Sequence, residues 1–143
     1  MTVKQISVFL ENKPGQLRSF TEVLAKRGID MRALSLADTR DFGIARLIVD
    51  DWNKADQVLR EEGYVFSTTP VLAVAIPDEP GGLNRVLAIL GDNGVNVEYT
   101  YAFITRKLDE AYMIFRVEDN DKAVALLTEA KVELLDQGDL SQL

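Results

Sequence analysis

One short sequence motif occurs twice in the chain, and this repetition constrains the fold more than any other feature does. "ENKPGQL" runs from Glu11 to Leu17, and "PDEPGGL" runs from Pro77 to Leu83, 66 positions later. After a two-residue insertion in the second copy, "VDDWNKA" (49–55) still matches "VEDNDKA" (117–123). A long period that occurs only twice favours a pair of domains over a solenoid array. We therefore predict two units, residues 1–69 and 70–143.

Both copies carry the same series of apolar patterns. Each begins with a β-branched run typical of a strand, and each then has apolar residues at helical spacing up to Gly28 or Gly94, where a helix is expected to stop. Two further strand-like runs follow, joined by a polar turn as in a hairpin. An amphipathic helix comes next, over 53–62 in the first copy and 121–130 in the second. "YVFST" and "VELLD" are predicted as closing strands, and "TTP" (68–70) as a short linker between the units.

This order predicts an α+β fold made of two ferredoxin-like βαββαβ units. Each unit is expected to form an antiparallel four-stranded sheet with both helices on one face. Domains this small are marginal when they stand alone, and the other sheet face and the sheet edges need covering. We therefore expect the chain to form a homodimer.

The amino-acid composition and the charge distribution argue against several classes of function. The 143 residues include no cysteine and no histidine, which removes thiolate chemistry and the usual general base, so we expect no catalytic residues, no metal and no cofactor. The whole net charge of −7 lies in residues 70–143, which argues against a nucleic-acid partner. No apolar run is long enough to span a membrane and the N-terminus lacks the pattern of a secretion signal, so a cytoplasmic location is expected.

The repeated phrase lies where a strand passes into a helix. A helix N-terminus presents unpaired N–H groups and the positive end of its dipole, so it suits carboxylates. Gly15 and Gly81 would let a ligand approach the backbone, and Gly82 would extend this opening. Asn12, Asp78 and Glu79 are acceptors for an ammonium group. Together these groups describe a site for a free α-amino acid, although a Pro-Gly turn with Asn or Asp as a helix cap is the simpler alternative.

The two units resemble ACT domains. The resemblance rests on the βαββαβ order, the turns "NKPGQL" and "DEPGGL", the segments "RGID" and "NGVN", and the helix starts "VDD…KA" and "VED…KA", and it covers essentially the whole chain. ACT domains are regulatory modules that bind amino acids, attached to enzymes such as aspartokinase or standing alone. The resemblance implies a regulatory protein that senses a free L-amino acid, with an enzyme of amino-acid metabolism as a further partner.

The resemblance also implies where the ligand sits, namely between the Pro-Gly turn of one ACT unit and the second strand of its neighbour. The turn residues carried over are Asn12, Lys13, Pro14, Gly15, Gln16 and Leu17, and in the second copy Asp78, Glu79, Pro80, Gly81, Gly82 and Leu83. The strand residues are Asp30, Met31, Arg32 and Ala33, or Asn96, Val97, Glu98 and Tyr99. Glu79 departs from the lysine often found before Pro-Gly, so the copies are expected to differ, and the two acids at 78 and 79 favour binding by the second copy.

Other functions remain as alternatives. RNA-binding RRM domains share the βαββαβ order, but they place aromatic residues on the central strands within a basic surround. The strand-like run "GIARLIV" (43–49) of the first copy contains no aromatic residue. The stronger rival is a ligand-independent regulatory subunit or interaction module that docks on an enzyme. Tyr99, Tyr101 and Phe103 alternate and so share one strand face, either for packing or beside the ligand.

Overall fold

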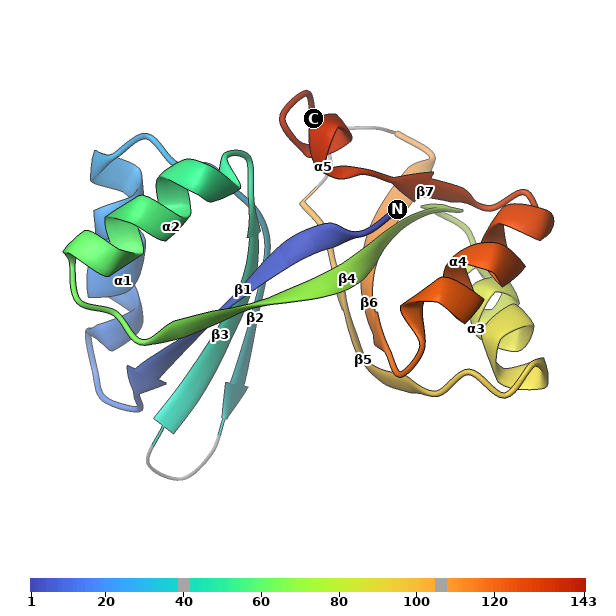
Figure 1. The fold of residues 1–143 in the computed structure, drawn as a ribbon, viewed down its shortest axis with the longest axis horizontal. Coiled ribbons are helices and arrows are strands. Elements are labelled where there is room, and N and C mark those ends of the chain that lie inside the picture. The colour runs from blue at the N-terminus through green and yellow to red at the C-terminus, as the bar shows by residue number, and fades with distance from the viewer. Residues whose placement is uncertain (39–41, 105–107) are drawn as a thin grey trace. The chain divides into compact units, whose positions relative to one another are not determined.

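The chain folds into two compact units in its computed structural model, which describes residues 1–38, 42–104 and 108–143 (Figure 1). Residues Lys4–Thr69 form the first, and Pro70–Leu143 together with Met1–Val3 form the second. They are called the N-terminal unit and the C-terminal unit below, and each is described by itself.

The N-terminal unit has the predicted order of elements. Its sheet runs β2-β3-β1-β4, and β3 is antiparallel to both β1 and β2. Figure 1 shows α1 and α2 together on one face of this sheet. The elements are β1 (Val3–Glu11), α1 (Gln16–Lys26), β2 (Met31–Asp38), β3 (Phe42–Val49), α2 (Trp52–Glu61) and the first residues of β4 (Phe66–Pro77).

The C-terminal unit repeats this arrangement. Its sheet runs β7-β4-β6-β5 with every pairing antiparallel, and α3 and α4 lie together on one face (Figure 1). The two units therefore share one topology, which confirms the predicted fold class. After β4 the elements are α3 (Gly82–Asp92), β5 (Val97–Ala102), β6 (Glu110–Val117), α4 (Asn120–Glu129), β7 (Glu133–Leu135) and α5 (Gln137–Leu140).

Two details differ from the sequence-based prediction. Residues 68–70 are not a linker, because they continue strand β4 from Phe66 to Pro77. Thr68, Thr69 and Val71 are β-branched and favour an extended chain, which outweighs the single Pro70. The short helix α5 was not expected, yet Asp136 and Asp139 form a reciprocal capping box at its start.

The apolar residues of each unit lie between the sheet and its helices. Ile6, Val8 and Leu10 alternate along β1 and pack with Phe20 and Leu24 of α1 and with residues of α2. The corresponding core of the C-terminal unit contains Leu72, Val74, Ile76, Val86, Leu90 and Leu127. Burial of such side chains contributes about 1.5–3 kcal/mol each, which supplies most of the stability of units this small.

Helices α1 and α3 end at the expected glycines. Gly28 and Gly94 have φ of 68° and 75°, in the left-handed region that favours glycine. Beyond each glycine, the N–H of Ile29 donates to the carbonyl of Leu24, and that of Val95 donates to Leu90. These bonds belong to the Schellman motif, which satisfies carbonyls at a helix end and turns the chain toward the next strand. In the described part of the chain, no helix has the length and apolar character needed to cross a membrane.

Candidate functional site

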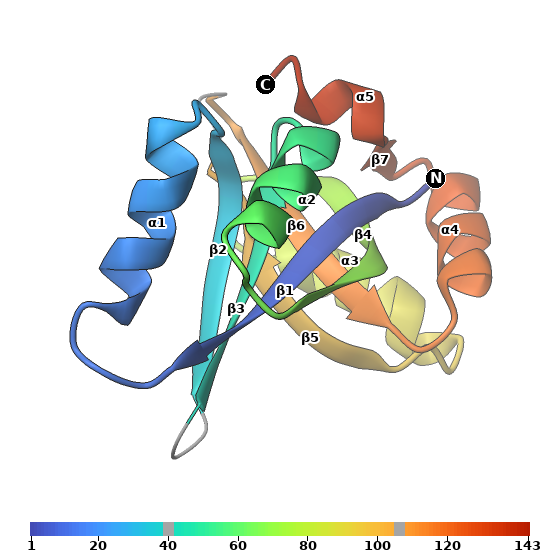
Figure 2. The same cartoon turned by 60° about the vertical axis from the view of Figure 1, so that its left-hand side comes forward.

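The turn between β1 and α1 leaves a helix N-terminus open. Gly15 occupies the position before the helix with φ of 84°, and no side chain among the described residues caps the helix start. The N–H of Gln16 donates to the carbonyl of Lys13 at 3.3 Å, while that of Ser19 returns to the carbonyl of Gly15 at 3.0 Å. Figure 2 shows the wide turn that carries the chain from β1 to α1. The first-turn N–H groups between those two are left for solvent or a ligand.

A pocket of about 180 Å³ lies beside this turn. The turn contributes polar groups, and the ends of β2 and β3 contribute apolar ones. We call it the turn pocket, and it is lined by Leu10, Glu11, Asn12, Lys13, Gln16, Leu17, Leu36, Ala37 and Gly43.

The charges at the turn pocket are already partly paired. The Nζ of Lys13 lies 2.6 Å from the Oε2 of Glu11. The hydrogen bond and the charge of Glu11 raise the pKa of Lys13, so this ammonium stays protonated. Because Lys13 and Glu11 neutralise one another, the open end of helix α1 remains as a source of positive potential in the pocket.

The second turn shares the uncapped helix start of the first and differs from it in its packing. Gly81 has φ of 87° and also leads into a helix without a side-chain cap. Gly82 is buried, and a Cβ at this position would lie 2.3 Å from the carbonyl oxygen of Pro77. Glycine is therefore needed at 82 for close backbone packing, and the expected role of Gly82 in widening a ligand opening stays a prediction. Glu79 is engaged as well, because its carboxylate forms an ion pair with Arg85.

Asp30 and Met31 do not meet the turn within their own unit. Met31 pairs with Val49 at one end of the hairpin, whereas the turn follows Glu11, which pairs with Phe42 at the other end. Both residues thus lie at the end of the sheet opposite the turn pocket. A contact with the Pro-Gly turn of a neighbouring unit stays a prediction.

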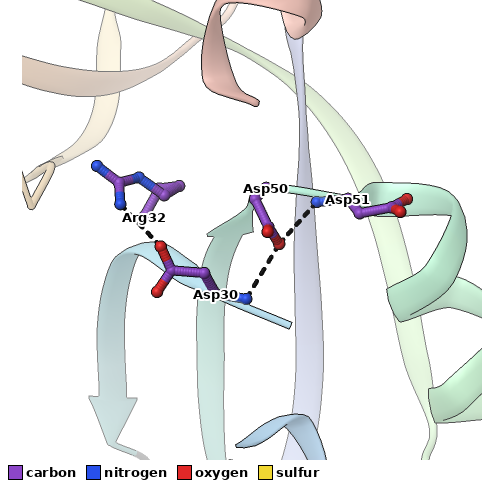
Figure 3. A network of polar contacts seen from close by, with 4 residues as sticks. All are labelled: Asp30, Arg32, Asp50 and Asp51. Carbon is purple, nitrogen blue, oxygen red and sulfur yellow. Dashed lines mark hydrogen bonds and ion pairs between the residues drawn. The ribbon is translucent and has the colours of Figure 1, made fainter. Parts of the chain in front are cut away.

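Asp30 belongs to a compact polar network instead (Figure 3). The guanidinium of Arg32, a residue only 4% exposed, donates to Oδ2 of Asp30 at 2.8 Å. The Oδ1 atom of Asp50 accepts from the N–H of Asp30 at 3.0 Å and from that of Asp51 at 2.9 Å. The carboxylate of Asp50 therefore holds the beginning of β2 against the beginning of α2.

The remaining predicted residues lie in or beside β5 of the C-terminal unit. Asn96 lines a cavity of about 650 Å³ together with residues of the β6–α4 turn. Val97 pairs with Val117 at the start of the strand. The ring of Tyr99 stacks on that of Tyr101, with centroids 6.4 Å apart and planes at 24°. Tyr99 therefore has a packing partner, and whether it also contacts a ligand stays a prediction.

Five lining residues of the turn pocket were not predicted from the sequence, namely Leu10 and Glu11 at the end of β1 and three residues of the next hairpin. Leu36, Ala37 and Gly43 come from the β2–β3 hairpin, some twenty to thirty positions after the turn. The register places Gly43 opposite Leu10 and Leu36 opposite Ala45, which brings the hairpin beside the turn. Leu36 keeps 52% of its surface accessible although its cross-strand partner Ala45 belongs to the core, and this exposure is a property of the fold that the sequence does not display. Across the described ranges, no three acidic side chains gather so as to hold a metal ion.

Comparison with known proteins identifies the family. The family model that describes an ACT domain pair matches residues 1–143 of this chain. The chain is similar to protein BT0572 from Bacteroides thetaiotaomicron, with 42% identity, a TM-score of 0.92 and coverage of 100% of this chain and 98% of that one. A search of curated proteins finds no match.

More distant likenesses show the same fold. The regulatory subunit of aspartate kinase from Thermus thermophilus, in its ligand-free form, is 18% identical with a TM-score of 0.64, over 89% of this chain and 91% of that chain. The corresponding subunit from Thermus flavus is 18% identical with a TM-score of 0.57, over 90% and 92%. The match over the full length, together with the duplicated βαββαβ topology, shows that the chain belongs to the ACT domain pair family.

Proposed function

We propose that the protein is a regulatory module that senses a free L-amino acid, and that the turn pocket of the N-terminal unit binds it. An ACT domain pair is typically a small-molecule-binding regulatory module, so the proposal concerns which ligand binds and where. The observation that carries it is the open start of α1, with Gly15 at φ of 84° and no side-chain cap, beside a pocket of about 180 Å³.

The carboxylate of the amino acid would bind at the start of α1. The first-turn N–H groups are directed out of the helix, and the dipole favours an anion there. A Cβ at Gly15 would meet no atom within 4 Å, so the space over this backbone is open to a ligand. Because Lys13 is paired with Glu11, the carboxylate need not compete with a free acid on the turn.

The ammonium group and the side chain would find different surroundings. Asn12 and the turn carbonyls supply acceptors, and hydrogen bonds to a charged group are about twice as strong as neutral ones. Leu10, Leu17 and Leu36 line the same pocket and offer apolar contact to the ligand's side chain. In a side-by-side assembly, Asp30 and Met31 of a neighbouring unit would complete the site. The presence of the turn pocket favours the N-terminal unit as the binding copy. The sequence alone favoured the second copy, because Asp78 and Glu79 offer two carboxylates to an ammonium group.

The regulated partner is proposed by analogy. Two of the similar structures are regulatory subunits of aspartate kinase, and their identity of 18% carries the fold alone. We propose that this chain acts in the cytoplasm as a homodimer on an enzyme of amino-acid metabolism and has no activity of its own.

A thermal-shift screen of the common L-amino acids tests the proposal. At a hundredfold excess over Kd, one site adds about 2.7 kcal/mol of stability. For a chain of this size this raises Tm by roughly 5–10 °C. We expect one amino acid or a small group to do so. No shift with any of them would contradict the proposal and favour the ligand-independent interaction module.

A further inference from the structure

The C-terminal unit contains a groove that the proposed function does not use. It has a volume of about 550 Å³ and is bounded by one side of α3, the end of β4 and the link between α4 and β7. Its apolar lining comes from Ile76, Val86, Ile89 and Val132. We call it the α3 groove. The turn pocket belongs to the other unit. Three of its lining residues, Leu10, Glu11 and Gln16, correspond in the repeat to Ile76, Pro77 and Gly82 of the groove. The counterparts of Arg85, Val86, Ile89 and residues 130–133 do not line the turn pocket.

Comparison of the two copies explains why there is space here. Phe20 of the N-terminal unit corresponds to Val86, and Tyr64 corresponds to Val132. The backbone confirms the second match, since the N–H of Tyr64 donates to Leu59 at 3.0 Å and that of Val132 donates to Leu127 at 2.9 Å.

In the N-terminal unit the two aromatic rings pack edge to face. Their centroids are 5.4 Å apart and their planes meet at 79°. In the C-terminal unit two valines take these positions, so the volume of both rings is missing. The groove is thus a place that one copy fills with its own side chains and the other leaves open.

The second copy also adds charges at this place. Arg85 stands where the first copy has Ser19, and Lys131 stands where it has Gly63. Lys131 has φ of 62°, and Gly63 has φ of 76° in the same helix-ending position. A residue with a Cβ is unfavourable in this conformation, so the lysine is held there against the preference of the backbone.

Lys131 is the cation available to a ligand. Arg85 is paired with Glu79, whereas no ion pair joins Lys131 to an acid in the part of the chain that the structure describes. Asp109, Glu110 and Glu133 also line the groove. Because acids surround the cations, a simple anion would be repelled, and a zwitterion with an apolar side chain fits better.

We propose that the α3 groove binds a free L-amino acid with a branched aliphatic side chain. Its carboxylate pairs with Lys131, its ammonium lies toward Glu133, and its side chain covers Val86 and Val132. This inference takes from the proposed function only the class of ligand, a free amino acid. The site itself is a second one, in the C-terminal unit.

Methyl NMR with L-leucine as the probe tests this site directly. We expect the methyl resonances of Val86, Ile89 and Val132 to shift saturably, and those of Leu17 and Leu36 in the turn pocket to report separately on the proposed function. The acid without the amine, 4-methylpentanoate, should bind about tenfold more weakly or worse, because it forfeits the contact with Glu133.

Two variants test whether the groove itself holds the ligand. Val86→Phe with Val132→Tyr copies the filled arrangement of the N-terminal unit and should abolish the shifts of Ile89. Lys131→Gly should weaken binding of L-leucine at least about tenfold, which corresponds to about 1.4 kcal/mol. It should also raise Tm, because glycine suits the backbone at 131, so lost binding cannot be attributed to unfolding. Lys122→Ala, in the same unit but outside the groove, is the matched control and should bind normally.

The outcomes separate the two sites. Shifts at Leu17 and Leu36 with none at Val86, Ile89 or Val132 would overturn the inference and leave the proposed function standing. Groove shifts without turn-pocket shifts for any amino acid would support the inference alone. Binding at the groove that is equally strong in Lys131→Gly would reject the assigned role of the lysine.

Discussion

Asp30 and Asp50 are joined by two hydrogen bonds, one between their backbones and one from the backbone of Asp30 to the side chain of Asp50. The N–H of Asp30 donates to Oδ1 of Asp50 at 3.0 Å, and the N–H of Asp50 donates to the carbonyl of Asp30 at 3.0 Å. The same Oδ1 accepts from the N–H of Asp51 (Figure 3). In the C-terminal unit, the N–H of Glu118 donates to the carbonyl of Asn96 at 3.2 Å, which reproduces the backbone half of this link.

Removal of the carboxylate should therefore destabilise only the N-terminal copy. Asp50→Ala loses two hydrogen bonds from backbone N–H groups to a charged acceptor at an exposed site, and we expect a loss of about 1–2 kcal/mol. Glu118→Ala is the matched control, and its effect should stay within about 0.5 kcal/mol. Urea denaturation of both variants measures the difference, and equal losses would show that the side chain of Asp50 contributes nothing beyond the backbone link.

The stability of the link between α1 and α2 should depend on pH. Hydrogen bonds from Arg27 and Gln57 lower the pKa of Glu61 below its ordinary value of 4.5. A carboxyl group with a lowered pKa in the folded state stabilises the fold fully above its unfolded pKa, and this stabilisation is lost as pH falls through the folded pKa. The stability difference between wild type and Glu61→Gln should thus shrink as pH is lowered from about 6 to 3. Denaturation curves that show a constant difference across this range would contradict the assignment.

Two glycines of helix α3 should respond to alanine in opposite directions. Gly82→Ala would place its methyl 2.3 Å from the carbonyl oxygen of Pro77, so the backbone must shift, and we expect a loss of about 1–3 kcal/mol. Gly91→Ala meets no atom within 4 Å and should stabilise the helix by about 0.5–1 kcal/mol. Thermal denaturation of both variants checks this. A neutral effect at Gly82 would mean that the turn is more adaptable than its geometry indicates.

The chain should form dimers through exposed apolar residues of its N-terminal unit. Phe9 and Phe42 keep 47% and 55% of their surfaces exposed, and Phe9 pairs with Ile44 on the sheet face away from the helices. Light scattering after gel filtration should give the mass of a dimer for the wild type. The double variant Phe9→Ser with Phe42→Ser should shift it toward the monomer, because aromatic residues dominate such interfaces. A monomeric wild type at high concentration would reject the dimer.

The fold was readable from the sequence because its signals are local and repeated. The Pro-Gly turns, the helix-ending Gly28 and Gly94 and the paired strand patterns each follow from a few neighbouring residues, and the second copy confirms each one. The continuity of β4 was missed because Pro70 was given more weight than the extended preference of Thr68 and Thr69. The capping box of Asp136 and Asp139 was a signal that could have predicted α5.

The candidate site was only partly readable because it depends on distant segments. Leu36 and Gly43 reach the turn pocket through strand register, which sequence spacing alone does not give. The role of Gly82 depends on where the carbonyl of Pro77 lies, and this too is a matter of packing. By contrast, the exchange of Phe20 for Val86 and of Tyr64 for Val132 was visible in the aligned copies, and it marks where the two units differ.

The central claim is that an amino acid binds at the open start of α1, and methyl NMR of Leu17 and Leu36 tests it most directly. The matched variants are Gly15→Ala and Gly81→Ala, since φ is 84° and 87° and neither methyl would meet another atom within 4 Å, so the backbone strain should be equal. With the amino acid that gives the largest thermal shift, we predict saturable shifts of both leucines in the wild type and in Gly81→Ala. In Gly15→Ala the shifts should be lost, because the methyl occupies the space over the first-turn N–H groups. Leucine methyls that do not respond in the wild type, or that respond equally in Gly15→Ala, would contradict the account.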